Sequence, residues 1–262
     1  MSENPKTRSF SYLGIAVCII TLLTVLRFWY AQTIELVGDE AYYWQWSKHL
    51  DWSYYSKGPG VALTIMGGTW FFGDTVLGVR FFAVLLSAGT ALGIYTLGRL
   101  LFSDKVGFFA LLFVMSIPLF ALGGVLMTID PLSVFFWVWS CVAFWMALQS
   151  RRLLWWVLAG LLIGAGMLAK YTNVVLLISF LVFLVFSSRD RKVLNFVNYL
   201  LMTTITVLCM APVYIWNKIN EWITIEHLLH RGGLDSSFTV NVFEAFYFLL
   251  MQAVGVSQFI WL

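Results

Sequence analysis

The sequence predicts an all-α, polytopic membrane protein with about eight membrane-spanning helices. Hydrophobic residues make up 61% of the 262 residues, charged residues make up only 11%, and the mean hydropathy is +0.86. The apolar residues form long continuous runs, whereas the strands of a membrane barrel would alternate apolar and polar residues. These observations exclude a soluble domain. The net charge of +3 is too small to indicate nucleic acid as a partner.

Eight apolar runs are interpreted as crossings, because a helix needs about 20 mostly apolar residues to span the hydrocarbon core. They are residues 10–31, 76–101, 106–126, 131–149, 153–169, 172–187, 195–216 and 240–262. Residues 61–72 are a shorter apolar stretch with two glycines, so we expect an interfacial or re-entrant helix there. The last run reaches Leu262 without a flanking charge. We therefore expect residues 1–262 to be the amino-terminal transmembrane portion of a longer protein.

The placement of charges predicts which helix ends face the cytoplasm. If residues 61–72 do not cross, the tail at residues 1–9 shares one side with most of the basic residues of the short loops. These are Lys6, Arg8, Arg99, Lys105, Arg151, Arg152, Arg189, Arg191 and Lys192. Cytoplasmic loops are rich in Lys and Arg, so we expect a cytoplasmic amino terminus. Residues 32–75, with interfacial helices, and residues 217–239 then form extracytoplasmic loops.

The polar part of the first loop, residues 38–60, gathers charged side chains among tryptophans and tyrosines. The aromatic residues are Tyr42, Tyr43, Trp44, Trp46, Trp52, Tyr54 and Tyr55. Such side chains settle at the boundary between a bilayer and water. We therefore expect this loop to lie along a membrane surface, in contact with lipids.

Asp39 and Glu40 are the first candidate catalytic residues. Neighbours on a helix point about 100° apart, so the two carboxylates cannot both face one reacting atom. One would act while the other orients it. Alternatively, Asp39 caps a helix that begins at Glu40.

Two lysines are candidates for binding a phosphate. Lys57 precedes Gly58-Pro59-Gly60, where free backbone amides would lie beside an ammonium group. Lys170 follows the run 153–169 and could pair with Asp130 or Glu40. The alternative for both lysines is a plain anchor at the lipid headgroups.

Asp130 stands between two strongly apolar runs, where an ionised carboxylate is costly unless it faces water or a partner. It is a candidate site residue, or else the cap of a helix that begins at Pro131. His227 and His230, with a carboxylate, could hold a divalent metal ion. Histidines at i and i+3 are a weak signal without further ligands.

Several motifs together resemble the bacterial members of the protein O-mannosyltransferase superfamily, which are GT-C membrane glycosyltransferases and include lipid A sugar transferases. They are Asp39-Glu40-Ala41-Tyr42-Tyr43-Trp44, Tyr54-Tyr55-Ser56-Lys57-Gly58-Pro59, Val79-Arg80-Phe81, Thr128-Ile129-Asp130, Leu168-Ala169-Lys170-Tyr171 and Pro212-Val213-Tyr214-Ile215-Trp216-Asn217. The resemblance implies a GT-C helix bundle in the bacterial inner membrane. It also implies inverting transfer of a sugar from a polyprenyl phosphate to a lipid, glycan or protein acceptor on the extracytoplasmic face.

The same resemblance implies roles for individual residues. Asp39, or its neighbour Glu40, becomes the base or a metal-associated carboxylate, and Asp130 becomes a second site carboxylate. Lys57, together with Lys170 and Tyr55, becomes the contact of the donor phosphate. Glu40 and His227 are the candidate metal ligands, but Ser56 replaces a carboxylate that many relatives have before the lysine position.

Two other classes of protein remain as alternatives. In a transporter or lipid flippase, Asp130 and Lys170 would be coupling groups near the middle of the membrane. A non-catalytic membrane subunit is the third alternative. The charges of this sequence gather at helix ends, which favours a reaction at the membrane surface over translocation.

Overall fold

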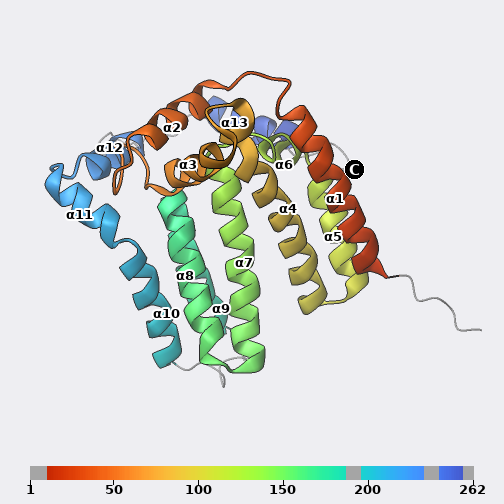
Figure 1. The fold of residues 1–262 in the computed structure, drawn as a ribbon. Coiled ribbons are helices and arrows are strands. Elements are labelled where there is room, and N and C mark those ends of the chain that lie inside the picture. Colours follow the sequence, from red (N-terminus) through yellow and green to blue (C-terminus); the bar gives the residue numbers. More distant parts are fainter. Residues whose placement is uncertain (1–10, 187–195, 233–241, 256–262) are drawn as a thin grey trace, which may run out of the picture.

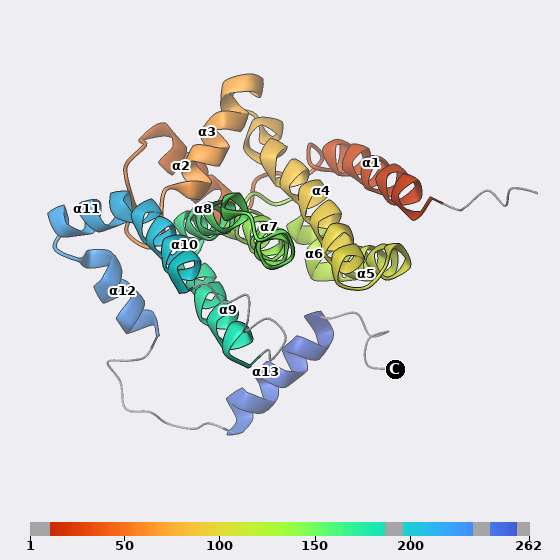
Figure 2. The same ribbon diagram turned by 90° about the horizontal axis from the view of Figure 1, so that it is seen from below.

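Every regular element that the structure describes is a helix, which confirms the predicted all-α class. The structure is a computed structural model, and it describes residues 11–186, 196–232 and 242–255. The long helices run side by side as a bundle, and several short helices gather at one of its ends (Figure 1). Viewed along the bundle in Figure 2, α7 and α8 lie between α4 on one side and α10 on the other.

Three helices are long and apolar enough to cross a membrane, and a bent pair would form a fourth crossing. The three are α1 (Tyr12–Tyr30), α4 (Val76–Leu101) and α7 (Ile129–Ser150), and the pair is α10 (Phe196–Cys209) with α11 (Ala211–Ile219), bent by 42°. The bundle also contains α8 (Leu153–Ala169), the short 3-10 helix η1 (Tyr171–Val174) and α9 (Val175–Phe186). The larger count of about eight crossings stays a prediction.

Prolines divide two of the runs that the sequence predicts to be single helices. The run 106–126 is broken into α5 (Asp104–Ser116) and α6 (Pro118–Gly123), and the residue between them, Ile117, is extended. Pro212 lies in the first turn of α11, just after the bend that ends α10. Proline has no N–H to donate and its ring clashes with the preceding turn. The prediction of one continuous helix over 106–126 is therefore wrong.

The first loop forms two helices, as the sequence predicts. They are α2 (Gly38–Lys48) and α3 (Gly60–Phe72), and α3 has only 13 residues. Gly73 ends α3 with φ of 69°, which glycine adopts without strain. The short helix α12 (Ile223–Arg231) lies at the same end of the bundle as α2 (Figure 1), while α13 (Val242–Gly255) lies across the bundle axis.

The core of the bundle combines aromatic rings with glycine contacts. Phe144 of α7 stacks on Phe180 of α9 with ring centroids 3.9 Å apart, and Trp156 of α8 is buried beside them. A Cβ atom at Gly160 would lie 2.6 Å from the carbonyl oxygen of Met202 on α10. Small residues allow membrane helices to approach closely. This packing holds α7 and α8 in a fixed relation, and both carry site residues at the same end.

Candidate active site

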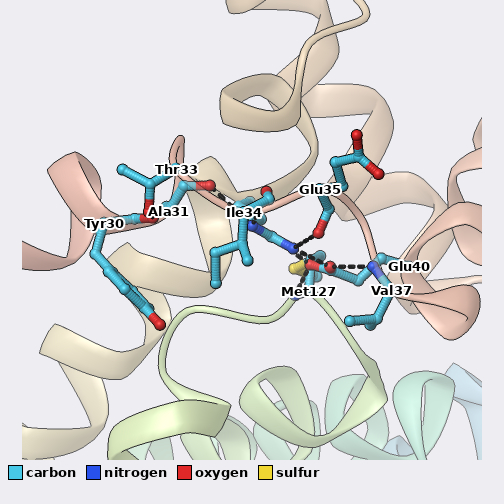
Figure 3. A network of polar contacts seen from close by, with 9 residues as sticks. Tyr30, Ala31, Thr33, Ile34, Glu35, Val37, Glu40 and Met127 are labelled. Carbon is cyan, nitrogen blue, oxygen red and sulfur yellow. Dashed lines mark hydrogen bonds and ion pairs between the residues drawn. The ribbon is translucent and has the colours of Figure 1, made fainter.

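Glu40 forms a buried ion pair with Arg80. Figure 3 shows the polar contacts around Glu40. The Arg80 Nε and Nη2 atoms donate to the two Glu40 carboxylate oxygens at 2.8 and 2.5 Å, and both side chains are 0% exposed. Arg80 also donates to the carbonyl oxygens of Ala31 and Ile34, at 2.8 and 3.0 Å, and of Glu35 at 2.9 Å. The guanidinium on α4 therefore fixes the chain that leaves α1.

The Glu40 carboxylate is fully occupied by protein donors. Besides the two bonds from Arg80, its oxygens accept from the backbone amides of Val37 at 3.1 Å and Met127 at 2.8 Å. Each oxygen thus accepts two hydrogen bonds, which uses the acceptor capacity of a carboxylate. Glu40 is a positioning residue in this structure, whereas its neighbour Asp39 is exposed. The alternative that Asp39 caps its helix is wrong, because α2 begins at Gly38 and Val37 is its N-cap.

Asp130 pairs with Lys170, as the sequence allows. The Lys170 Nζ atom lies 2.8 Å from Asp130 Oδ1, and the side chains are 38% and 59% exposed. The cap of α7 is Thr128, whose hydroxyl accepts from the Asp130 amide at 3.3 Å, so the alternative that Asp130 caps the helix is wrong. Both charged residues lie at helix ends. They do not occupy the middle of the bundle, where a transporter would need them.

Lys57 lies in a region of positive charge. Burial lowers the pKa of the Lys57 ammonium, and the nearby cations Arg231 and Lys170 lower it further, while Asp130 opposes them. Three basic side chains from the first loop, the end of α8 and α12 thus influence one another electrostatically. Such a group of cations attracts an anion with several oxygens, such as a phosphate.

The chain next to Lys57 lies directly against the end of α8. A Cβ atom at Gly58 would lie 2.4 Å from the carbonyl oxygen of Leu168, and one at Gly60 would lie 3.0 Å from the same oxygen. Only glycine lets the backbone come this close without a shift. The Gly-Pro-Gly sequence therefore brings Lys57 to the helix end that carries Lys170.

Tyr43 of α2 is buried and is influenced electrostatically by both candidate carboxylates. Burial raises the pKa of its hydroxyl to about 12, with further contributions from the negative charges of Asp39 and Asp130. Arg231 acts in the opposite direction. Both candidate carboxylates are thus near enough to act electrostatically on the same phenol, which stays protonated at neutral pH. Sequence reasoning had counted Tyr43 only among the interfacial aromatic residues.

Two pockets involve the first loop or the start of α7, and one of them includes charged residues described above. An apolar pocket of about 590 Å³ begins at Asp130 and Lys170 and continues along Leu119, Phe120 and Val134. A more polar pocket of about 750 Å³ is lined by residues of the first loop, α11 and α12. Its lining includes Asp51, Tyr55, Trp216, Glu221 and Glu226, and the Trp216 indole donates to Asp51 at 2.6 Å.

The two candidate metal ligands are not brought together. The His227 ring packs on Tyr55 with centroids 4.6 Å apart, and the Glu40 oxygens are occupied by Arg80 and backbone amides. Among the residues that the structure describes, no three His, Cys, Asp or Glu side chains group as a metal site would require. These residues do not fit a divalent metal ion. Tyr55 lines the polar pocket.

Sequence reasoning did not identify three arginines that the structure places at or near the site. Arg80 stood only in a motif, although an arginine within an apolar run signals a buried partner. The same signal applies to Arg27, which lies inside α1 and is 9% exposed. Arg231 gave no clear signal, because its position near Lys57 depends on the tertiary fold.

Comparisons with known proteins agree on one class. The sequence profile of the dolichyl-phosphate-mannose-protein mannosyltransferase family matches residues 56–216, more than half of the chain. Lipid A galacturonosyltransferase RgtD of Rhizobium johnstonii is 24% identical over 225 residues, which cover 86% of this chain and 46% of that protein. An undecaprenyl phosphate-alpha-4-amino-4-deoxy-L-arabinose arabinosyl transferase of Pseudomonas aeruginosa is 33% identical over 145 residues, 53% of this chain and 26% of that protein. No solved structure matches the chain.

The helices form a bundle of membrane type with acidic and basic side chains grouped at one end. The family match covers the loop of Lys57, the turn of Asp130 and the end of α8. The chain belongs to the dolichyl-phosphate-mannose-protein mannosyltransferase family, which confirms the resemblance in the sequence motifs. It spans about half the length of the first of these relatives and about a quarter of the second.

Proposed function

We propose that this chain carries the reaction centre of a glycosyltransferase that uses a polyprenyl-phosphate-linked sugar on the extracytoplasmic side of a bacterial inner membrane. The observation that supports the proposal is the Lys170–Asp130 ion pair of 2.8 Å at the end of α8, against which Gly58 packs the loop of Lys57. Asp39 and Asp130 also both act electrostatically on Tyr43. A carboxylate can accept the proton of an acceptor hydroxyl, and ammonium groups can stabilise a leaving phosphate. Both requirements of sugar transfer are thus available in one place.

The transfer forms a bond between the acceptor oxygen and the anomeric carbon, and breaks the bond between that carbon and the donor phosphate oxygen. The acceptor attacks from the face opposite the phosphate, so the configuration inverts. The acceptor proton passes to Asp39, which is exposed, whereas its neighbour Glu40 is buried. The electron pair of the broken bond stays on the phosphate. Lys57 and Lys170 stabilise that charge more in the transition state than before it.

The remaining residues hold this arrangement. Asp130 orients Lys170 through the ion pair at 2.8 Å, and the buried Glu40 fixes the start of α2 beside Asp39. Tyr43 stays neutral near these acids, since the pKa of its hydroxyl is raised to about 12. Tyr55 belongs to the acceptor side in this proposal, because it lines the polar pocket.

The acceptor headgroup fits the polar pocket best. Its volume of about 750 Å³ accommodates sugar units, and its carboxylates and aromatic rings match hydroxyl groups and sugar faces. The relatives' names mention lipid A as an acceptor and an undecaprenyl phosphate-linked sugar as a donor. We propose the same kinds of donor and acceptor here, with the sugar itself left open by the pocket.

The test measures sugar transfer from radiolabelled undecaprenyl-phosphate sugars to lipid A in membranes that contain the full-length protein. Asp39→Asn, Asp130→Asn and Lys57→Ala are each expected to lower transfer by about 100-fold or more. Asp104→Asn is the control. Asp104 lies where α4 ends and α5 begins, whereas the site lies near the start of α4, and Asp104 pairs with Arg99 at 2.9 Å. Wild-type rates in all three site variants would refute the assignment.

Membrane orientation needs a separate test. Single cysteines at Gln32 and Ser150, in a chain whose three native cysteines are replaced, lie at opposite ends of the bundle. A thiol reagent that cannot cross the inner membrane should label position 32 from the periplasm, and position 150 only after lysis. Labelling of position 150 in intact spheroplasts would refute the proposed cytoplasmic amino terminus.

A further inference from the structure

Arg27 is a buried cation in a helix that is long enough to cross the membrane. Its side chain is 9% exposed, and it lies one turn before the end of α1 at Tyr30. Its Nη1 atom donates to the Ser87 hydroxyl at 2.7 Å, and its Nη2 atom to the Met115 sulfur at 3.8 Å. Neither partner carries a charge. Ion pairs within the described residues involve Lys48, Arg80, Arg99 and Lys170, but not Arg27.

This arrangement is unlike that of the other intramembrane arginine of the bundle. Arg80 has a carboxylate and three carbonyl oxygens around it, whereas Arg27 has a hydroxyl and a thioether. A buried cation without an anion is costly in an apolar environment, and such residues are functional candidates. The charge of Arg27 is therefore available for an anionic ligand.

The apolar pocket lies directly beside this guanidinium. Ser87 and Met115, the two partners of Arg27, both line the pocket, and so does Gly124. A Cβ atom at Gly124 would lie 3.0 Å from Arg27 Cζ and 2.5 Å from Ser87 Oγ. The glycine thus leaves space for the guanidinium at the pocket wall. Because the Ser87 oxygen accepts from Arg27, its own proton can be donated to a ligand in the pocket.

We propose that Arg27 and Ser87 form a second phosphate-binding position, in which the apolar pocket holds a polyprenyl phosphate carrier. This inference rests on the proposed function, which requires such a carrier. The pocket is about 590 Å³ in volume and mostly apolar, so it suits a hydrocarbon chain with one anionic group. Arginine and a hydroxyl supply the donors that phosphate oxygens need. The carrier docks here from the bilayer, apart from its contact with Lys57.

Binding is measured without turnover, by native mass spectrometry of the full-length protein titrated with undecaprenyl phosphate. Arg27→Gln and Ser87→Ala are each expected to weaken binding at least tenfold, and Arg27→Lys less than Arg27→Gln because it keeps the charge. Undecaprenol, which has no phosphate, should bind equally to wild type and Arg27→Gln. Lys57→Ala should leave the Arg27-dependent part of the binding in place.

Two glycine substitutions form a matched pair that tests the pocket wall without a change of charge. Gly124→Ala is expected to weaken binding because its methyl group would displace the guanidinium. Gly123→Ala is expected to bind like wild type, because a Cβ atom there meets nothing within 4 Å. Thermal unfolding of each variant shows whether it is folded.

Three results would overturn the inference. The first is wild-type affinity in Arg27→Gln, and the second is an equal loss in the two glycine variants. The third is competition by phosphatidylglycerol as strong as that by undecaprenyl phosphate, which would indicate a general headgroup site. The outcome is separable from that of the proposed function. Arg27-dependent binding without sugar transfer would refute only the function, whereas Asp39-dependent transfer with Arg27-independent binding would refute only this inference.

Discussion

Replacement of Glu40 by glutamine tests the central ion pair of the site. The substitution keeps the shape of the side chain but removes its charge, and its amide group can accept at only one end. The oxygens of Glu40 accept from Arg80 at 2.8 and 2.5 Å, and from the amides of Val37 and Met127. An amide NH₂ would face two of these donors. The cost of two unpaired buried donors is about 2–6 kcal/mol, at about 1–3 kcal/mol each.

A second route to the magnitude agrees with the first. Removal of one partner of a buried ion pair costs about 3–5 kcal/mol, because the other charge is left without compensation. Both side chains are 0% exposed, so solvent cannot replace the lost partner. We therefore expect Glu40→Gln to lower the free energy of unfolding by about 3–5 kcal/mol. Arg80→Met should have a similar effect, and the double variant should cost less than the sum of the two.

The assay is unfolding by SDS in mixed micelles, followed by tryptophan fluorescence and repeated at several protein concentrations. The matched control is Arg99→Gln, which breaks an arginine–carboxylate pair of 2.9 Å whose side chains are 53% and 51% exposed. Exposed pairs contribute about 0.2–1 kcal/mol. If Glu40→Gln destabilises the protein no more than Arg99→Gln does, the buried pair does not hold the site together and the reasoning is refuted.

Three further predictions concern the loop of Lys57 and its surroundings. Gly58→Ala should lower the free energy of unfolding by about 1–3 kcal/mol, because its Cβ would lie 2.4 Å from the Leu168 oxygen. Gly38→Ala is the control, because a Cβ there meets nothing within 4 Å. In the same unfolding assay it should stay within about 0.5 kcal/mol of wild type. Burial and nearby cations hold the pKa of Lys57 below its usual value, so donor binding should be lost as pH rises through that lowered pKa. Lys57→Arg stays charged and should retain donor affinity at alkaline pH in a titration, and an unchanged alkaline loss would contradict this. The pKa of Tyr43 is about 12, so Tyr43→Phe should leave the shape of the pH–rate profile below pH 10 unchanged.

The sequence was sufficient to select the segments of the candidate site, but not the partners of each residue. Helical spacing indicated that Asp39 and Glu40 cannot both face one reacting atom. Which of the two is buried depends on Arg80, which is 40 residues away and meets Glu40 only after α2 and α4 pack. Long-range partners of this kind leave no local pattern. The paired Asp130 and Lys170, also 40 residues apart, were predictable only because both stood out at the ends of apolar runs.

The breaks in two apolar runs, by contrast, had a local signal in the sequence that hydropathy did not reveal. Pro118 and Pro212 are visible in the sequence, and each marks a break that hydropathy alone conceals. The mean hydropathy of a run does not register that one residue lacks a backbone N–H, although the lack of that donor can end a helix. The metal candidates illustrate a different limit of residue type as a signal. His227 has suitable chemistry, but its ring is packed on Tyr55, and residue type alone does not reveal such packing.

The position of the two acids in their helices explains why one carboxylate can organise both. Asp39 is the second residue of α2 and Asp130 is the second residue of α7. A helix amino terminus carries partial positive charge, which interacts favourably with an acidic side chain in the first turn. Glu40 accepts hydrogen bonds from the amide of Val37, just before α2, and of Met127, just before α7. The starts of both helices are therefore held by the same buried side chain, and a shift of Glu40 would move Asp39 and Asp130 together.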